Sequence, residues 1–206
     1  MTGLSLEHDA LIEVAVLVTD FELNQLGDGI DVIIAPPPQA LAQMGDFVRD
    51  MHIKSGLLTE LEGGLSMAQG QERVMEYVRQ WVPEPRKAPL GGNTVGTDRA
   101  FLARDMPELE GYLHYRNVDV SSIKELSRRW YPRAYFNSPD KHGGHRALGD
   151  IRDSIAELRY YREAVFVPAP GPDSAHAKAI ASRHGVQAPA APTPGVAADE
   201  ASSSGS

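Results

Sequence analysis

The sequence predicts an α/β fold in which helices flank a mixed β-sheet. Two apolar runs rich in β-branched residues, at 10–19 and 30–35, indicate strands near the N-terminus. From residue 40 onward the apolar spacing becomes helical, and short apolar stretches separate the helical segments. Strands that are followed by alternating helices and strands are typical of an α/β sandwich on a mixed sheet.

The first two strands lie close together in the chain. The run ALIEVAVLVT at 10–19 has Glu13 as its lone charge, which suits a strand in the interior of a sheet. The second run, at 30–35, stops at three consecutive prolines. The link at 20–29 is rich in turn formers and has room for a short strand at 22–25. We therefore expect an antiparallel meander at the start of the domain.

Helical periodicity is clearest at 66–82. Val74, Tyr77, Val78 and Trp81 follow the i, i+3, i+4, i+7 rule, and prolines end the segment. Other segments have shorter versions of this pattern, or an apolar run between turn formers. Further helices are expected at 40–51, 57–61, 98–106, 122–130 and 145–165, strands at 88–92 and 112–120, and a loop at 131–144.

The C-terminal part of the chain differs in composition from the rest. Residues 167–206 are mostly Ala, Pro, Gly and Ser, without apolar periodicity. Such a segment buries too little apolar surface to offset the entropy lost on ordering. We expect a folded domain at 1–166 and a disordered tail at 167–206, with at most a transient helical turn at 175–183.

The composition narrows the class of protein. The 206 residues include no cysteine, which excludes disulfides and thiolate zinc sites and favours a reducing, cytoplasmic location. The longest apolar stretch is too short to span a bilayer. A net charge of −8 argues against a protein that grips long nucleic acids through a basic surface. It allows a short nucleotide substrate that is held through metal ions.

One segment that differs from ordinary packing is GGNTVGTDRAFL, at 91–102. It runs from a short strand through a turn of small residues into a helix. Asp98 lies in the first turn of that helix, and Thr97 is the expected N-cap. Asp98 is therefore a candidate metal ligand. The alternative is that its carboxylate only complements the helix dipole.

A second such segment, at 141–163, begins KHGGHRALGD. Asp150 follows His145 by five residues, which on one continuous helix puts the side chains about 140° apart. They face one site only if His145 lies ahead of the regular helix. A histidine there can take a proton from water while the aspartate holds a divalent ion. The alternative is a loop histidine and a solvated helix charge. Asp153 and Glu157 are expected to be solvent-facing partners of nearby arginines.

Together these segments resemble the DEDDh exonucleases, in which four carboxylates bind two divalent ions and a histidine is the general base. The block MPELEGYLHYRNVDVSSIKELSRRW at 106–130, the start MTGL and the run LIEVAVLVTD are more specific and resemble the oligoribonuclease branch of that family. The resemblance covers residues 1–163. It implies an RNase H-like fold, Mg²⁺ or Mn²⁺ as cofactor, and 3′→5′ hydrolysis of very short RNA to 5′-mononucleotides.

The resemblance assigns catalytic roles to three of these residues. Asp98 and Asp150 would be metal ligands. His145 would be the general base that deprotonates the attacking water. The folded domain at 1–166 would then be the exonuclease domain.

The same resemblance implies how the bases of the substrate are held. Leu4 would wedge between two bases. Phe47, where the family often has tryptophan, would stack on the 3′ base, with His52 beside it.

The other end of the substrate would be bound by residues around 94 and 115–121. Thr94, Arg116 and Ser121 would cap the 5′-phosphate, which would limit the substrate to very short lengths. Tyr115 would reach the active site from the other subunit of a homodimer and act there as a second catalytic residue. The alternatives are that Tyr115 is a core aromatic and that Arg116 pairs with the glutamate at 108 or at 110.

The chain departs from the family at its start. The family opens with a strand that ends Asp-x-Glu-Met-Thr-Gly-Leu, whose two acids are metal ligands. Met1 stands where the methionine after that glutamate belongs, so the first strand and both acids are absent from this chain. We expect translation to start upstream. The alternatives are a catalytically incomplete dimer that binds nucleotides without turnover, and a DNA-trimming exonuclease of the same family.

Overall fold

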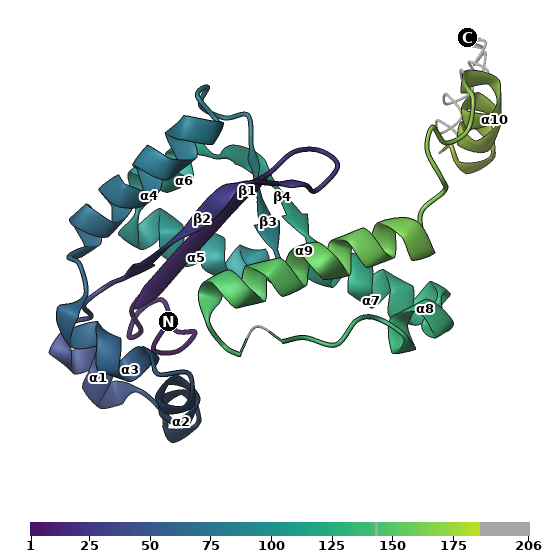
Figure 1. The fold of residues 1–206 in the computed structure, drawn as a ribbon. Coiled ribbons are helices and arrows are strands. Elements are labelled where there is room, and N and C mark those ends of the chain that lie inside the picture. The colour runs from purple at the N-terminus through teal and green to yellow at the C-terminus, as the bar shows by residue number, and fades with distance from the viewer. Residues whose placement is uncertain (143, 186–206) are drawn as a thin grey trace, which may run out of the picture. The chain divides into compact units, whose positions relative to one another are not determined.

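The computed structural model describes residues 1–142 and 144–185. Contacts within the chain divide it into two units, Met1–Phe166 and Val167–Ser206. The first unit contains an antiparallel and a parallel pair of strands with helices around them (Figure 1). The predicted α/β class with mixed strand directions is therefore confirmed.

An antiparallel hairpin forms the first pair. It consists of β1 (Glu13–Thr19) and β2 (Gln25–Ile33), with the first residue of β1 opposite the last residue of β2. The register shifts at an irregularity between Val16 and Val18. Because Val14 and Val32 lie opposite each other and are both buried, one face of this hairpin contributes to the core.

The expected three-stranded meander is wrong. The residues at 22–24 belong to the turn, and a single strand begins at Gln25. The side chain of Asp20 explains this turn, because it accepts the backbone N–H groups of Glu22 at 2.9 Å and Asn24 at 2.8 Å. When an aspartate side chain accepts hydrogen bonds from backbone N–H groups of the residues that follow it, the chain forms a turn there and not a strand.

The second pair consists of β3 (Pro89–Gly92) and β4 (His114–Asp119), which run parallel. In the part of the chain that the structure describes, the strands form two separate two-stranded sheets. Side chains and backbone of β1 and β3 line the same cavity, which holds several of the predicted site residues.

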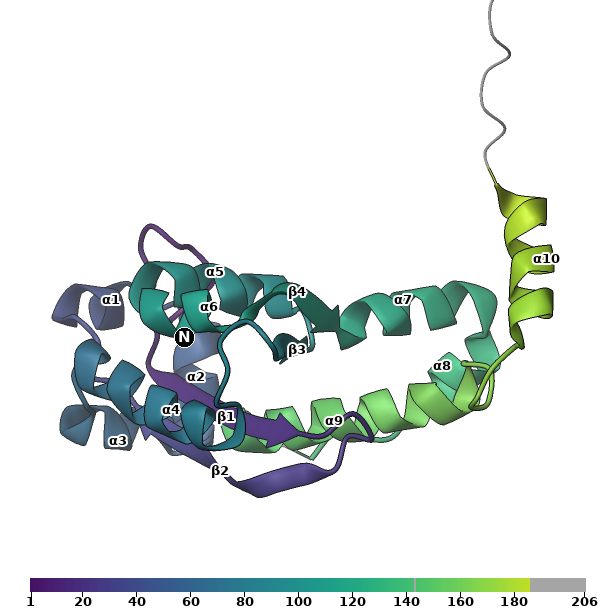
Figure 2. The same cartoon turned by 90° about the horizontal axis from the view of Figure 1, so that it is seen from above.

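Helices make up most of the first unit. They are α1 (Pro38–Gln43), α2 (Asp46–Lys54), α3 (Leu57–Glu60), α4 (Met67–Trp81), α5 (Val95–Asp105), α6 (Pro107–Tyr112), α7 (Val120–Trp130), α8 (Pro132–Phe136) and α9 (Ala147–Ala164). A 3₁₀ turn at Leu61–Gly63 follows α3. The arrangement from above shows α7 and α9 side by side (Figure 2).

The sequence pattern did not predict α6 and α8. Each of these short helices has a proline, Pro107 or Pro132, at its first position. Proline suits that position because its fixed φ is helical and its missing N–H would have no partner there. The loop expected at 131–144 therefore begins with a helical segment.

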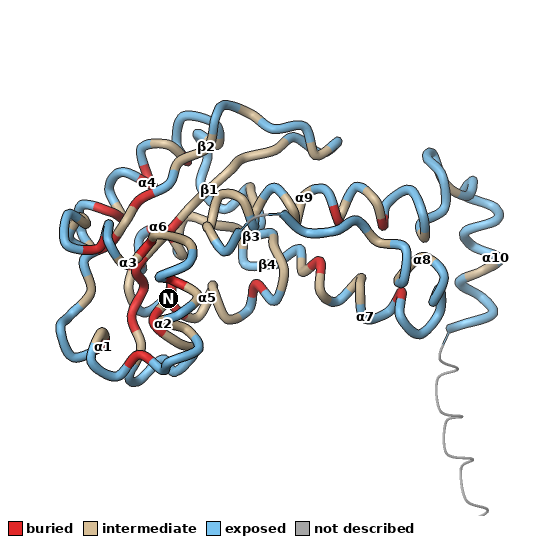
Figure 3. The backbone as a smooth tube through the Cα atoms, turned by 60° about the horizontal axis from the view of Figure 1, so that its bottom comes forward, coloured by how far each residue is buried: buried red, intermediate tan, exposed pale blue. Residues whose placement is uncertain are grey.

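The core lies where α4 and α5 meet the hairpin, and buried residues concentrate there (Figure 3). Val74 and Val78 of α4, with Phe101 of α5, pack in one cluster with residues of both strands. A capping box starts α4, because Ser66 accepts the backbone N–H of Gln69, whose side chain bonds back to the backbone N–H of Ser66. By contrast, α7 and α8 are largely exposed (Figure 3).

The second unit contains α10 (Ser174–His184), an 11-residue helix with no buried residue. Asp173 caps it by accepting the backbone N–H of His176 at 2.7 Å. The expectation of at most a transient turn at 175–183 is therefore wrong, because a capped helix spans that stretch. Of the predicted tail at 167–206, the part at 186–206 lies outside the described residues.

Candidate active site

One cavity of about 660 Å³ brings together five of the predicted site residues. They come from the N-terminal segment, α2, α5, the loop before α9, and α9 itself. The five residues are Leu4, His52, Asp98, His145 and Asp150. Residues that are up to 146 positions apart in the chain thus line one space.

Asp98 lies in the first turn of α5, as the sequence predicts. The helix starts earlier than expected, however, because Thr94 and not Thr97 is the N-cap. Thr94 has a left-handed φ of 54°, and its backbone N–H donates to Asp119 Oδ1 and to Ser121 Oγ, each at 3.0 Å. Partial burial raises the pKa of Asp98. A bound cation would offset that cost of burying the carboxylate.

His145 lies ahead of α9 and not on the helix. It has a left-handed φ of 61° and follows Gly144, whose φ is 64°. Asp150 lies in the first turn of α9, where its backbone N–H donates to the carbonyl of Arg146 at 3.0 Å. The bend at the two left-handed residues therefore lets His145 and Asp150 line the same cavity. Partial burial raises the pKa of Asp150, while His145 lowers it.

His52 is a buried residue of α2. Its Nε2 lies 2.9 Å from the carbonyl oxygen of Met1, whereas its Nδ1 is buried and has no hydrogen-bond partner among the described residues. Burial lowers the pKa of His52.

Leu4 and Phe47 are 78% and 83% exposed, so both present apolar surface to solvent. Leu4 lines the cavity, and Phe47 is absent from its lining.

A second group of predicted residues lies around the start of α5 and α7. The hydroxyls of Thr94 and Ser121 are 3.1 Å apart, and Ser121 Oγ also donates to Asn93 Oδ1 at 3.0 Å. Tyr115 is 72% exposed, so it is not a core aromatic. The Arg116 guanidinium lies 5.4 Å from the centre of the Tyr115 ring, and its Nε donates to the phenol oxygen.

This second group is separate from the cavity lining: Thr94, Tyr115, Arg116 and Ser121 do not line it. The glutamate at 110, one of the alternative partners of Arg116, instead accepts two hydrogen bonds from Arg99, at 2.9 and 2.8 Å. Thr94, Tyr115 and Arg116 are thus exposed and Ser121 is half-buried, and all four lie outside the cavity lining.

Glu157 is not the solvent-facing partner of arginines that the sequence predicts. Its side chain is 3% exposed and lies between α7 and α9. It accepts Lys124 Nζ at 2.9 Å, Lys141 Nζ at 3.1 Å and Asn93 Nδ2 at 3.0 Å. These cations and the amide hold its pKa below the usual range, although burial acts against them.

Asp153 accepts the backbone N–H of His142 at 2.7 Å and lines the cavity.

The sequence pattern identified Glu13 only as the lone charge of the first strand, and it did not predict the contacts that Glu13 makes. Its side chain is 6% exposed and lines the cavity. It bonds to Arg146 and to the backbone at the start of α9. The available signal was a single acidic residue inside an otherwise apolar strand, because a buried carboxylate needs a partner.

Divalent cations fit the chemistry of this cavity in part. Among residues 1–142 and 144–185, no group of three or more His, Cys, Asp or Glu side chains is arranged to hold a metal ion. Asp98 and Asp150 nevertheless supply carboxylate oxygens to one space. One or two protein carboxylates, completed by water and substrate phosphates, are typical of magnesium sites.

Within the described residues, no helix combines the length and apolar character that a membrane span requires.

Comparisons with known proteins identify the family of this chain. The sequence profile of the exonuclease family matches residues 1–158, which include all ten predicted site residues. Oligoribonuclease of Streptomyces griseus is 71% identical over 192 residues, which cover 93% of this chain and 94% of that protein. The chain belongs to the oligoribonuclease family of exonucleases. As an exonuclease, it is a hydrolase of phosphodiester bonds, and exonucleases of this family use divalent metal ions.

Two further comparisons concern a second bacterial relative and a solved structure with a similar fold. Oligoribonuclease of Cutibacterium acnes is 63% identical over 184 residues, 89% of this chain and 91% of that protein. Among solved structures, an exonuclease I from Methylocaldum szegediense matches with a TM-score of 0.55 and 21% identity. That match covers 80% of this chain and 39% of the other, so it concerns the fold alone. It supports the RNase H-like fold that the exonuclease resemblance implied.

Proposed function

We propose that this exonuclease is a 3′→5′ exoribonuclease that degrades very short RNA, from dinucleotides to a few nucleotides, to 5′-mononucleotides. The observation that carries the proposal is the meeting of His145, Asp98 and Asp150 in one cavity of an oligoribonuclease-family chain. A general base and two carboxylates are the groups that metal-assisted hydrolysis of a phosphodiester requires.

His145 accepts the proton of the attacking water. As the bond from the water oxygen to phosphorus forms, the bond from phosphorus to the O3′ of the preceding nucleotide breaks, which releases a 5′-mononucleotide. Asp98 and Asp150 are the residues that would hold the cations. Mg²⁺ or Mn²⁺, when bound, supplies positive charge to the attacking and leaving oxygens.

The 3′ end of the RNA is held by apolar and aromatic groups. Leu4 lines the cavity and is exposed, so it can insert between two bases. Phe47 is exposed on α2, the helix that also carries His52, and offers a ring for base stacking. Stacking is tolerant of base identity, which suits an enzyme that degrades short RNA of any sequence.

The 5′-phosphate binds at the group formed by Thr94, Arg116 and Ser121. Two hydroxyls that are 3.1 Å apart and an exposed guanidinium are suitable donors to a phosphate. Because this group lies outside the cavity lining, a bound 5′-phosphate sets the distance that the substrate can span. This arrangement favours very short chains.

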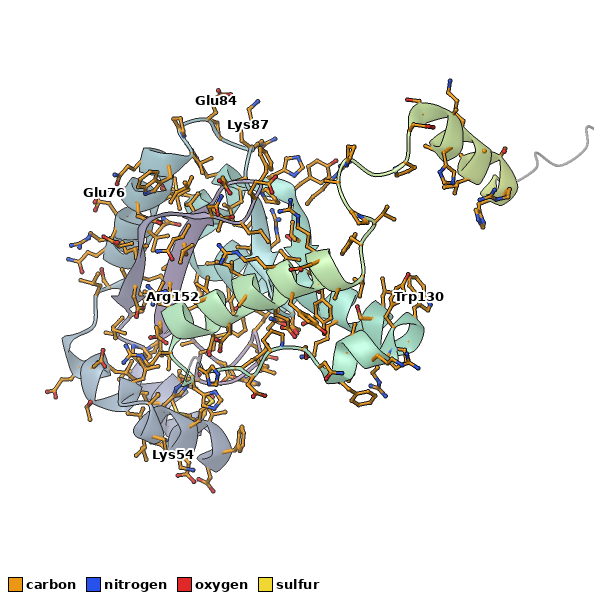
Figure 4. All side chains as sticks on the ribbon, turned by 45° about the vertical axis from the view of Figure 1, so that its right-hand side comes forward. Lys54, Glu76, Glu84, Lys87, Trp130 and Arg152 are labelled. Atoms are coloured by element: carbon orange, nitrogen blue, oxygen red, sulfur yellow. The ribbon has the colours of Figure 1, made fainter. Side chains whose placement is uncertain are left out.

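We also propose that the enzyme is a homodimer that pairs through β4, α7 and α8. These elements expose a set of large apolar side chains: Tyr115, Val118, Leu126, Trp130 and Phe136. We call this set the β4–α8 surface. Trp130 projects at the end of α7 (Figure 4) and is 66% exposed. Exposed apolar residues that gather on adjoining elements are typical of protein interfaces.

A chain-length series tests the proposed activity. The purified protein is incubated in Mn²⁺ with 5′-phosphorylated oligoribonucleotides from dinucleotide to decanucleotide, and with the matching DNA set. We expect kcat/KM to be highest for the RNA dinucleotide. Equal rates on long single-stranded DNA would instead favour a DNA-trimming exonuclease. Binding of the dinucleotide without turnover would favour a catalytically incomplete nucleotide-binding dimer.

The cytoplasmic location remains a prediction.

A further inference from the structure

Arg146 joins carboxylates from two distant parts of the fold. Its Nε lies 2.8 Å from Glu13 Oε1 on β1, and its Nη1 lies 2.7 Å from Glu60 Oε1 in α3. Its Nη2 donates to the second oxygen of Glu60 at 3.2 Å. The planar guanidinium thereby fixes the residue that precedes α9 against both β1 and α3.

Glu13 makes a second contact at the same place. Its Oε2 accepts the backbone N–H of Ala147, the first residue of α9, at 3.2 Å. The N-cap residue of α9, Arg146, provides no side-chain cap of its own. The carboxylate of Glu13 therefore replaces the local cap, and its negative charge is favourable at a helix N-terminus.

Two residues of the active site depend on this fixed point. His145 directly precedes Arg146 and has a left-handed φ of 61°, which a non-glycine residue keeps only where its surroundings impose it. Asp150 donates its backbone N–H to the carbonyl of Arg146 at 3.0 Å. A shift of Arg146 would therefore move the backbone of His145 and the first turn that carries Asp150.

We propose that Glu13 is a positioning residue for hydrolysis: through Arg146 and Ala147 it fixes His145 and Asp150 in the cavity. The inference rests on the proposed function, in which those two residues act. Glu13 suits the role because its side chain is 6% exposed and both of its oxygens have partners at the start of α9. A buried, fully bonded carboxylate confines its partners to one geometry.

The kinetic test uses Glu13→Gln in the full chain, which keeps the shape of the side chain and removes its charge. We expect kcat on a 5′-phosphorylated RNA dinucleotide to fall about tenfold or more, with KM changed by less than about twofold. Arg146→Lys should lower kcat in the same way, because one ammonium group cannot bind both carboxylates as the guanidinium fork does. The matched control is Glu22→Gln, which removes an exposed ion pair with Arg162 at the hairpin turn. It should leave kcat unchanged.

A second measurement needs no turnover. Hydrogen exchange of the folded protein should show faster exchange at residues 145–151 in Glu13→Gln, with exchange in α4 unchanged. Unchanged exchange at 145–151, or an equal loss of kcat in Glu22→Gln, would overturn the inference. So would loss of Mn²⁺ affinity with unchanged exchange, because Glu13 would then act on the metal directly. A parent protein without activity would overturn the proposed function, while the exchange experiment would still test the role of Glu13.

Discussion

His145 has a backbone conformation that few histidines adopt, and it lines the cavity with two aspartates. In the proposed mechanism its imidazole accepts the proton of the attacking water. We expect His145→Ala to lower kcat by about 10²-fold or more, with a smaller effect on KM, as is usual for loss of a general base. Initial rates with a 5′-phosphorylated RNA dinucleotide measure this.

A neighbouring histidine provides the control for that substitution. His142 lies in the same loop but does not line the cavity, and its backbone N–H makes the contact to Asp153. His142→Ala should therefore retain the parent kcat. If His145→Ala kept nearly full activity, the general base would have to be a different residue.

Asp31 gives the protein a pH-dependent stability. Partial burial of its side chain, followed by the charge of Glu13, raises the pKa of Asp31 from 3.8 to about 6. The folded state therefore binds this proton more tightly than the unfolded state does. The contribution of Asp31 to stability is most favourable below pH 4 and falls as the pH rises to 6. Above pH 6 the ionised carboxylate disfavours folding.

Replacement of Asp31 tests that sign. Asp31→Asn should raise Tm at pH 8, where the parent carries the unfavourable charge, and should change Tm less at pH 5. Asp28→Asn, on the exposed part of the same strand, should have the same small effect at both pH values. A lower Tm for Asp31→Asn at pH 8 would mean that the attraction to Arg146, 3.8 Å away, outweighs the repulsion by Glu13. Thermal unfolding followed by circular dichroism provides the measurement.

At the scale of elements, local signals explain which helices could be predicted. The apolar period and the capping box of α4 act within a few residues of each other, so the sequence predicts this helix within one residue at each end. The short helices α6 and α8 lack a full period, and their prolines suggest a break as readily as a start. The turn at Asp20 depends on hydrogen bonds that a hydropathy pattern does not show.

The residues of the candidate site likewise differ in whether the sequence could predict them. Asp98, His145 and Asp150 could be proposed because they lie in short motifs that resemble a known family. The role of Glu13 could not, since its bond to Arg146 joins residues 133 positions apart. The burial of Glu157 also depends on Lys124 and Lys141, which come from other segments of the chain. Such long-range ion pairs leave no periodic signal in a sequence.

Removal of residues 167–206 tests whether α10 contributes to catalysis. All predicted site residues lie before residue 163, and no residue of α10 is buried. We expect the shortened protein to keep kcat and KM within about twofold of the full chain, because exposed helices bury little surface for folding. A large loss of activity would show that this part of the chain docks on the exonuclease domain. Steady-state kinetics on the RNA dinucleotide, with the full chain in parallel, distinguishes these outcomes.

For the whole molecule, the main question is whether one chain contains a complete site. The cavity lining includes His145, Asp98 and Asp150, whereas Tyr115 lies outside it and is exposed on β4. In the proposed homodimer, Tyr115 would act in catalysis from the neighbouring subunit. The β4–α8 surface to which Tyr115 belongs offers the contact. In a twofold dimer each subunit would then give its tyrosine to the site of the other.

Disruption of that surface should separate the subunits. Trp130→Asp places a charge in the apolar surface, so we expect a monomer by analytical ultracentrifugation and a loss of dinucleotide hydrolysis. Phe21→Asp is the control, because Phe21 is fully exposed at the hairpin turn, which belongs to other elements. It should leave both the dimer and the activity intact. An active Trp130→Asp monomer would show that the site needs no second subunit.

Complementation between two inactive variants tests the shared site directly. Tyr115→Phe and His145→Ala should each form dimers with low activity, the first without the phenol group and the second without the base. After the subunits exchange, half of the dimers are mixed, and one site in each mixed dimer has both groups if the tyrosine acts across the interface. The mixture should then regain roughly a quarter of the parent activity. If Tyr115 acts within its own subunit, every site lacks one group and mixing restores nothing.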